Sequence, residues 1–583
     1  MSKSKWSFSG WESFWESDGQ PPEKVLLTTF TLDTNFLAFS LLPRLFGMSE
    51  NEGTIEWYAA FKQHLRRTPV AVFVDAGHWQ DARNRSVFFE AAGGHVYPVR
   101  VPDGIQRGIQ HSKLWLLQFR DHIRIVIGSC NLTEEGFSGQ IQCLWTADLE
   151  RSKHDVEDKQ TTKLKTFLDR LAKATTIDGK KAITYVEQWK KSLSNCTWPP
   201  DVSLVPVIPT KKTDALAGVK LALAEMNLVR TKRFSYDLQV QVFECGQLDK
   251  EWLAHLIENF YANSLRLHWP RAEGSPPVWK GMVLPETTAK TLLEHDSHCS
   301  IAALSFSKCV EKANERLPHG KVIAGREPHP KSRAYAFVVL GSSNLSKAAW
   351  SRNFELNVLL KYPGGVYFND DTKDLTAKDV YVSEPPKYET NSKLDLYARW
   401  DKSDVVIEFS APRDWQQIVL KLLDAKKNVM TEITQRIDKT NNSSTHRFDG
   451  PPATSHWLSA SGTGPNSECT VPIIGSLADL VSNLLPHDAD LERARHSWTL
   501  RQYGWNPEFK RAGDYRVPWV ERAMGVIGTI DCWKEPALAR RDAAGIELLE
   551  SLKWFQDHSI GEERLGFELA SNELLARLDG GRM

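Results

Sequence analysis

The 583-residue chain lacks the features that mark several large protein classes. Its eight cysteines are scattered without a Cys-x-x-Cys pair, which argues against a zinc module and a disulfide framework. Neither sign of charge is in excess, because 73 basic residues balance 73 acidic ones, so any attraction for phosphate has to be local. No run of eighteen apolar residues occurs, and the N-terminus lacks the apolar core of a signal peptide. We therefore expect an intracellular protein with no membrane span.

The chain contains one short pattern twice. The first copy is His111-Ser112-Lys113, followed twenty residues after the histidine by the asparagine of Gly128-Ser129-Cys130-Asn131-Leu132. The second copy is His319-Gly320-Lys321, followed by Gly341-Ser342-Ser343-Asn344-Leu345. Two complete sets of His, Lys and Asn predict one shared site, since a single His-x-Lys or Gly-Ser-x-Asn is a common accident.

These residue types suit the transfer of a phosphoryl group. In an extended segment, residues two apart point to the same face, so His-x-Lys presents an imidazole beside an ammonium group. Two lysines and two asparagines can bind the charged oxygens of a pentacoordinate phosphorus. One neutral histidine can attack phosphorus, and the other, when protonated, can give a proton to the leaving oxygen. We expect neither a metal nor another cofactor, because no cluster of metal ligands is visible and this chemistry needs none.

The histidine of the second copy has a competitor, because His329-Pro330-Lys331 also matches the pattern. His329 precedes Asn344 by only fifteen residues, which leaves no room for a hairpin, and Pro330 would disturb strand pairing. His319 precedes Asn344 by twenty-five residues, enough for two strands and a loop. We assign the role to His319 and Lys321 and place His329 in the loop.

A further regularity links the two copies. Gln142 follows Asn131 by eleven residues, and Glu355 follows Asn344 by the same number. A hydrogen-bonding side chain at this offset could hold a catalytic histidine in its working tautomer. The alternative is that both residues are ordinary surface positions, but their equal place in a duplicated frame favours a role in support of the histidines.

The order of expected elements also repeats. Alternating and continuous apolar runs predict strands at 70–76, 113–119 and 123–129, and a helix at 161–174; a similar order recurs from residue 237. We expect an α/β fold with domains at 1–199 and 200–400, one for each motif set. Beyond them we expect a largely helical extension, divided into a strand and helix at 401–438, a linker or loop at 439–468 and a helical accessory region at 469–583.

The paired motifs resemble those of the phospholipase D superfamily, and within it the tyrosyl-DNA phosphodiesterases. Most of that superfamily has His-x-Lys-x4-Asp, but here Gln118 and Arg326 replace the Asp, as is typical of this branch. GSSNLSKAAW resembles the branch's TSANLSKAAWG, and FELNVLL resembles its YELGVLF. The similarity covers about residues 24–400 and implies two pseudo-symmetric phospholipase D-like α/β/α sandwich domains.

The resemblance implies roles for single residues. His111 would be the nucleophile and His319 the general acid and base, with Glu355 supporting the first and Gln142 the second. Candidates for binding the substrate are Ser129, Ser342 and Arg107; Arg107 stands where the family has a stacking aromatic residue.

The family removes 3′-phosphotyrosyl groups and other 3′ adducts from DNA. A similar activity here predicts a DNA-repair enzyme that acts as a monomer on single-stranded or frayed ends, and in the nucleus if the source is eukaryotic. The same residues would also serve a general phospholipase D-type nuclease, an exonuclease or a lipid phosphodiesterase. A third alternative is a module that binds DNA ends without cleaving them, although two intact motif sets argue against it.

Overall fold

A computed structural model describes the chain from residue 4 to residue 474 with gaps, and six residues near the C-terminus. The described ranges are 4–7, 20–48, 55–83, 88–91, 93–102, 105, 108–151, 158–209, 216–231, 235–294, 298–306, 313–327, 335–362, 374–383, 394–401, 404–411, 415–424, 427–437, 443–449, 455, 457–462, 468–474, 553, 556–557, 568 and 571–572. The chain divides into two compact units, one made of residues 1–32, 70–78 and 96–391, the other of residues 33–69, 79–95 and 392–583.

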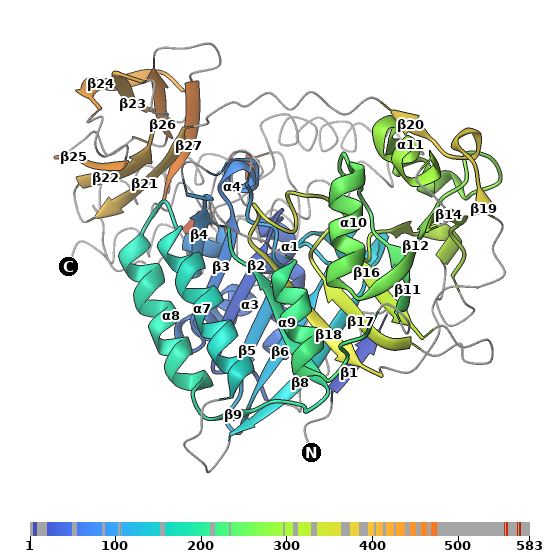
Figure 1. Cartoon of the computed structure of the whole chain (residues 1–583). Helices are drawn as coiled ribbons and strands as arrows, with labels where there is room; N and C mark the ends of the chain where they lie inside the picture. The colour runs from blue at the N-terminus through green and yellow to red at the C-terminus, as the bar shows by residue number, and fades with distance from the viewer. Residues whose placement is uncertain are drawn as a thin grey trace, which may run out of the picture. The chain divides into compact units, whose positions relative to one another are not determined.

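The first unit contains two large sheets, one from each motif-bearing half (Figure 1). The first sheet runs in the order β1 (Ser4–Ser7), β8 (Leu144–Arg151), β6 (His122–Gly128), β5 (Leu114–Gln118), β2 (Lys24–Thr29), β3 (Val70–Asp75) and β4 (His95–Val99), with β9 (Cys196–Thr197) paired to β8. The second runs in the order β10 (Val202–Val207), β18 (Glu355–Lys361), β17 (Tyr335–Gly341), β16 (Val322–Arg326), β11 (Tyr236–Gln241), β12 (Ala262–Trp269), β14 (Cys299–Ala303) and β19 (Asp374–Leu375).

The two sheets repeat one order of strands. In each, a strand that follows His-x-Lys lies between the second strand of the half and the strand that leads to Gly-Ser-x-Asn: β5 lies between β2 and β6, and β16 between β11 and β17. β2 and β11 each pair in parallel with the next strand along the chain, and the motif strands pair antiparallel. The two motif sets are therefore carried at corresponding places of their sheets.

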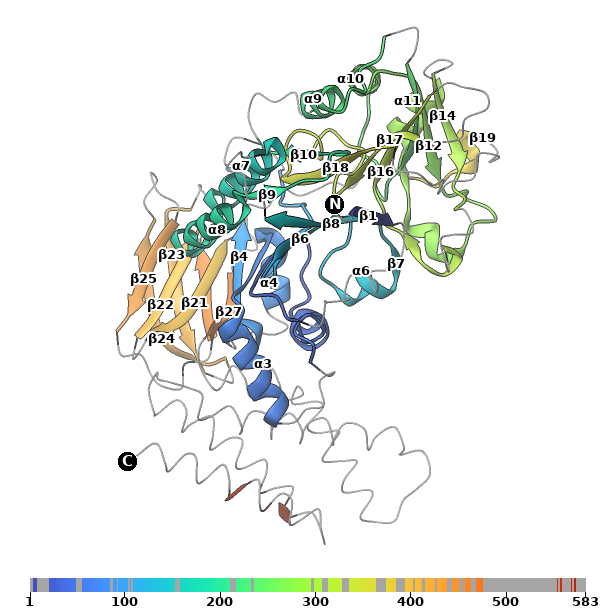
Figure 2. The same ribbon diagram turned by 90° about the horizontal axis from the view of Figure 1, so that it is seen from below.

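The two sheets pack together in one core. Strands β6 and β8 of the first sheet contact β17 and β18 of the second (Figure 2). The core they share contains Ile125 and Trp145 from the first sheet and Val338 and Leu356 from the second, all of them buried. Because such a core excludes water and fixes side chains in place, it can hold the ends of the motif strands at a defined separation.

Helices cover the sheets. α7 (Lys159–Lys173) and α8 (Gly179–Leu193) lie side by side and belong to the first half, and α9 (Ala217–Glu225), α10 (Lys250–Asn259) and α11 (Glu286–Glu294) belong to the second (Figure 1). Asp158 caps α7 by accepting a hydrogen bond from the Gln160 amide at 2.7 Å, and Asp249 caps α10 through the Trp252 amide at 2.9 Å. The predicted α/β class is confirmed, as are the strands at 70–76, 113–119 and 123–129 and the helix at 161–174. The predicted domain limits at 199 and 400 stay predictions.

The second unit contains short helices and a third sheet. Its helical elements are α1 (Thr34–Phe36), the π-helix η2 (Leu37–Leu41), α2 (Leu42–Leu45), α3 (Ile55–Arg67), most of α4 (Ala76–Arg83) and α5 (Phe88–Ala91). The sheet runs in the order β24 (Val429–Arg436), β23 (Gln417–Leu423), β26 (Trp457–Gly462), β27 (Glu468–Ile474), β21 (Asp395–Asp401), β22 (Asp404–Ser410) and β25 (Ser443–Phe448). Figure 1 shows it curled into two layers, and both layers contribute to one apolar core.

This third sheet corrects the predicted helical extension. The helix predicted within 401–438 is wrong, because β23 and β24 form a hairpin there. Ile418, Leu420 and Leu422 are buried at every second position, which is the period of a strand. Asp424 accepts a hydrogen bond from the Asn428 amide at 2.8 Å and Lys427 has a positive φ of 65°, so the polar run between the strands is a turn.

The linker predicted at 439–468 is wrong as well. β25 and β26 lie within it, and Leu458 and Ala460 of β26 are buried in the core of the third sheet. Serine and threonine are common in strands with one solvated face, so the polar composition misled the prediction. β27 occupies the start of the predicted helical region at 469–583; residues 475–552 lie outside the described residues, and the six described residues after them are helical.

Candidate active site

The two His-x-Lys motifs lie directly before β5 and β16, and each is tied to the opposite half. The His111 amide donates to the Phe354 carbonyl at 2.9 Å, and the His319 amide donates to the Ile141 carbonyl at 2.9 Å. Further contacts of the same kind are the parallel bridge between Gln110 and Phe354 and the short parallel pair of β7 (Gln140–Ile141) with β15 (Leu317–Pro318). Each histidine is thus positioned by the half that does not carry it.

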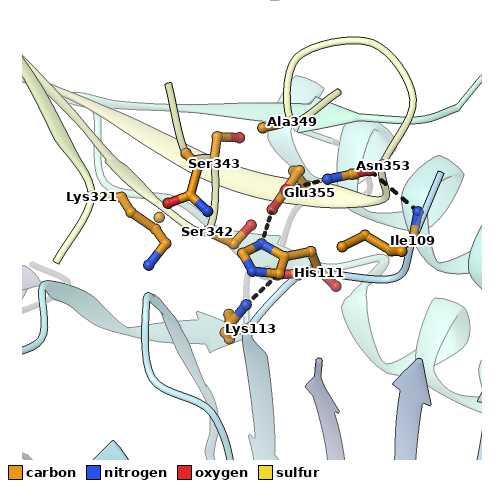
Figure 3. Close-up of polar contacts among 12 residues, drawn as sticks. Ile109, His111, Lys113, Lys321, Ser342, Ser343, Ala349, Asn353 and Glu355 are labelled. Carbon is orange, nitrogen blue, oxygen red and sulfur yellow. Dashed lines mark hydrogen bonds and ion pairs between the residues drawn. The ribbon is translucent and has the colours of Figure 1, made fainter. Parts of the chain in front are cut away.

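His111 is held through one ring nitrogen by Glu355. The two side chains are buried, and Nδ1 lies 3.0 Å from Glu355 Oε2, as Figure 3 shows. The other carboxylate oxygen accepts a hydrogen bond from Asn353 Nδ2 at 3.1 Å, and Asn353 Oδ1 accepts from the Ile109 amide at 3.2 Å. Because a carboxylate only accepts, Nδ1 of the neutral ring carries the proton, and the Nε2 lone pair is left for chemistry.

His319 is held in the same way by Gln142. Its Nδ1 lies 3.0 Å from Gln142 Oε1, and both side chains are buried. Gln142 Nε2 donates to the Gly136 carbonyl at 3.0 Å and to Gln140 Oε1 at 2.8 Å, which fixes the orientation of the amide. Since the amide oxygen can only accept, Nδ1 is again the protonated nitrogen, and Nε2 carries the lone pair, 3.4 Å from Lys321 Nζ.

Each lysine bonds to the backbone of its own motif, and Lys321 Nζ also lies 3.4 Å from both ring nitrogens of His319. Lys113 Nζ donates to the His111 carbonyl at 2.7 Å, and Lys321 Nζ donates to the His319 carbonyl at 2.8 Å. Both lysines are buried, and Figure 3 shows them beside the His111 ring. Among the described residues, no carboxylate contacts either amino group directly.

Burial and like charge depress the pKa values of all four groups. Burial, with Lys113 and Lys321 adding to it, lowers the pKa of His111 to about 4, while Glu355 acts in the opposite direction. Burial followed by both lysines and His111 brings the pKa of His319 well below its usual range. Burial lowers the pKa of Lys321 to about 8, and burial together with Lys321 brings the pKa of Lys113 well below its usual value. Groups of the two halves thus act on one another electrostatically.

The asparagines and the serines of the two Gly-Ser-x-Asn motifs differ in their hydrogen bonds. Oδ1 of Asn131 and of Asn344 is buried and has no hydrogen-bond partner among the described residues, and Asn344 Nδ2 lies 3.5 Å from Glu244 Oε2. The serines are fully buried and turned into the protein: Ser129 Oγ accepts from the Cys143 amide and donates to Gln142 Oε1, and Ser342 Oγ accepts from the Leu356 amide. This burial argues against the predicted role of the serine side chains in binding substrate. They hold the next strand instead.

Two other predicted positions, Arg107 and His329, lie outside the described residues. Two aromatic residues were missed by the sequence analysis. Phe30 follows β2, and its ring centroid lies 5.0 Å from that of His111; Phe243 follows β11 and lies 4.8 Å from His319. This pair could have been found from the sequence by extending the comparison of the two copies upstream to β2 and β11, because a phenylalanine follows each of these strands.

Two imidazoles, each held at Nδ1 and each belonging to a motif that also contributes a buried lysine, are thus supplied by two similar sheets. The model of the family described as tyrosyl-DNA phosphodiesterase matches residues 55–278. The resemblance of the chain to the tyrosyl-DNA phosphodiesterase branch of the phospholipase D superfamily is thereby confirmed, and with it the prediction of a phosphodiester hydrolase.

Similar solved structures include yeast tyrosyl-DNA phosphodiesterase, at 14% identity over 66% of this chain and 96% of that chain, with a TM-score of 0.44. A mutant of the same yeast enzyme is similar at 13% identity over 63% and 91% of the two chains, also with a TM-score of 0.44. Polyphosphate kinase from Porphyromonas gingivalis is more distant, at 11% identity over 62% and 44%, with a TM-score of 0.30. No curated protein sequence matches the chain. At these values the structures add no argument to that of the family match.

Among the described residues, no helix is long and apolar enough to cross a membrane. Within the same part of the chain, no group of three or more His, Cys, Asp or Glu side chains is placed to hold a metal ion.

Proposed function

We propose that the protein hydrolyses 3′-phosphotyrosyl and related 3′ adducts on DNA through a phosphohistidine intermediate, without a metal ion. One observation carries the proposal: both motif histidines are held at Nδ1 by an acceptor, 3.0 Å away in each case, so Nε2 is the nitrogen of each neutral ring that carries the lone pair. A nucleophile on one side and a proton donor on the other are what an in-line displacement at phosphorus requires.

In the first step, Nε2 of neutral His111 attacks phosphorus, the N–P bond forms and the P–O bond to the tyrosyl group breaks. His319 gives its proton to the departing phenolate oxygen. In the second step, His319 takes a proton from water, the hydroxide attacks phosphorus and the N–P bond breaks, which leaves a 3′-phosphate and free His111. The burial of His319 favours its neutral form in the free protein, and an arriving phosphate anion supplies the charge that favours its protonation.

The remaining groups stabilise the negative charge that the phosphoryl oxygens carry. Lys113 and Lys321 provide two cations from opposite halves, and the amides of Asn131 and Asn344 provide hydrogen-bond donors. The repeated strand order supports a description of the halves as pseudo-symmetric phospholipase D-like domains. We further infer DNA with single-stranded or frayed 3′ ends as the partner, a monomeric state and, in a eukaryote, a nuclear location.

The experiment that tests the proposal is cleavage of an oligonucleotide with a 3′-phosphotyrosyl end in the presence of EDTA. We expect release of tyrosine and a 3′-phosphate product at an unchanged rate after chelation, because the reaction uses only side chains. Cutting within intact strands would instead favour a general nuclease of the same superfamily. Tight binding without any product would indicate a protein that binds DNA ends but does not cleave them.

The rate should depend on the charge of Lys321. Its pKa of about 8 means that the ammonium form is present below pH 8 and is lost above it. If the cation stabilises the transition state, kcat/KM falls as pH rises through 8. The variant Lys321→Arg keeps its charge over this range, since the arginine pKa lies above about 12. We expect a lower absolute rate for this variant but no alkaline decrease between about pH 7.5 and 9.5.

The matched control for this prediction is Lys280→Arg at an exposed lysine, which should keep the decrease near pH 8. An alkaline decrease of the same position and size in Lys321→Arg would assign it to another group and contradict the prediction.

A further inference from the structure

The segments that follow β2 and β11 correspond to each other residue by residue, and they differ in charge at one position. Leu32 forms a parallel bridge with Leu132, directly after Asn131, and Cys245 forms the same bridge with Leu345, directly after Asn344. The residues before them therefore correspond as well. Phe30 corresponds to Phe243, and Thr31 corresponds to Glu244.

Each half places an aromatic ring against its own histidine. Phe30 meets His111 edge to face, Phe243 lies tilted against His319, and both rings are partly exposed. The ammonium groups of Lys113 and Lys321 each lie 5.7 Å from the ring of their own half. A partly exposed ring beside a reacting group can stack on a planar substituent of the substrate.

The next position along the chain differs in charge between the two halves. Glu244 is exposed, and its Oε2 lies 3.5 Å from Asn344 Nδ2, whereas the first half has the neutral Thr31. An exposed carboxylate repels the phosphates of a nucleic-acid strand and attracts cationic groups, while a neutral group is not repelled. The strand is therefore disfavoured on the side of the second half.

The direction of the reaction decides which substituent lies there. The leaving group departs opposite to the nucleophile, and under the proposed function it receives its proton from His319. The ring that touches His319 is Phe243, and the carboxylate next to that ring is Glu244. Both features thus lie on the side from which the adduct leaves.

We propose that Phe243 and Glu244 form the subsite for the leaving group, with Phe243 stacking on an aromatic ring and Glu244 favouring an adduct that is neutral or cationic over one that is anionic. The inference rests on the proposed function. The adduct would be a phenol whose neighbouring groups are uncharged or basic, such as a tyrosine that is followed or preceded by basic residues.

The first test compares Phe243→Leu with the unchanged protein on two 3′ esters of one oligonucleotide, one with a phenol and one with an aliphatic alcohol. We expect the ratio of kcat/KM for phenol over alcohol to fall about tenfold, a typical effect of losing a ring contact in a pocket. If Phe243 only positions His319, the alcohol suffers more, because its higher pKa makes it depend more on the acid. A ratio that rises or stays constant would therefore overturn the assignment.

Two matched variants fix the interpretation of this test. Phe30→Leu changes the ring beside the nucleophile, which both esters need, and should lower both rates by one factor. Phe306→Leu changes a partly exposed phenylalanine that packs on Trp279, and should leave both rates unchanged. A selective loss of the phenol ester in Phe30→Leu would place the leaving group on the other side and refute the proposal.

The second test addresses charge with two phenols of similar leaving ability, tyramine and 4-hydroxyphenylacetate. Glu244→Gln should reduce the preference for the tyramine ester about fivefold, an effect expected of a single partly solvated charge. An unchanged preference would remove Glu244 from the subsite.

Affinity separates failure of the subsite from failure of the proposed function. The same four esters are bound to His111→Ala protein, which cannot turn them over, with and without Phe243→Leu or Glu244→Gln. If the unchanged protein cleaves none of the esters, the proposed function fails, while the ratios of Kd still report on the subsite. Ratios of Kd that the two variants do not alter, together with unaltered ratios of kcat/KM, would overturn the inference.

Discussion

His111→Ala is expected to lower the release of tyrosine from a 3′-phosphotyrosyl oligonucleotide by at least about 10⁴-fold. No other described side chain can replace its Nε2, because the second imidazole is fixed on the opposite side of the pocket by Gln142. A 10⁴-fold loss corresponds to about 5.5 kcal/mol of transition-state stabilisation. The measurement is single-turnover cleavage followed by gel electrophoresis.

The loss should reflect chemistry and not unfolding. Removing the ring leaves Glu355 buried without its imidazole partner but still bonded to Asn353 at 3.1 Å. The variant His111→Asn keeps a donor toward Glu355, so we expect it to melt within a few degrees of the unchanged protein and to remain inactive. Activity within about tenfold of the unchanged protein in either variant would exclude His111 as the nucleophile.

His319→Ala is expected to accumulate a covalent complex between protein and DNA. A phenol has a pKa of about 10, so its departure needs little help from an acid and the phosphohistidine forms. Its hydrolysis does need a base to activate water, and this base is lost. We expect the second step to slow by about 10²- to 10⁴-fold, the usual contribution of a general base. Denaturing electrophoresis of labelled DNA detects the complex as a band of reduced mobility.

The controls for this experiment come from the chain itself. His111→Ala combined with His319→Ala should give no complex, because the nucleophile is absent. His329→Ala should cleave the substrate with little change, since the sequence assigns that residue to a loop. A loss in His329→Ala as large as that in His319→Ala would reverse the choice between the two His-x-Lys motifs, and a failure to trap any complex in His319→Ala would contradict the covalent route.

The parts of this protein that the sequence predicted are those that it contains twice. A comparison of one half with the other was enough to predict the motif strands, the place of His319 and the eleven-residue offset of Gln142 and Glu355, since both halves meet the same physical demands. Contacts across the halves, such as that of Asn353 with the Ile109 amide, join residues 244 positions apart and leave no local pattern. Phe30 and Phe243 were missed because an apolar residue after a strand looks like ordinary core.

The single-copy region was predicted worst. At 414–437, alternation of Ile418, Leu420 and Leu422 competed with a run of good helix formers, and the pairing with β26 decided in favour of a strand. Its length and composition also matched a helix, because the turn at 424–428 contains no glycine or proline to mark it. Long-range pairing of this kind is set by partners that lie far away along the chain.

The unequal pair of acceptors at the two histidines has a consequence for how the molecule uses its internal symmetry. If the two halves were identical, either histidine could act as the nucleophile, and a bound ester could be cleaved in either orientation. With a carboxylate at Nδ1 of His111 and an amide oxygen at Nδ1 of His319, the two imidazoles differ in their electrostatic support. A glutamate in one half and a glutamine in the other are thus enough to make the two histidine sites chemically unequal.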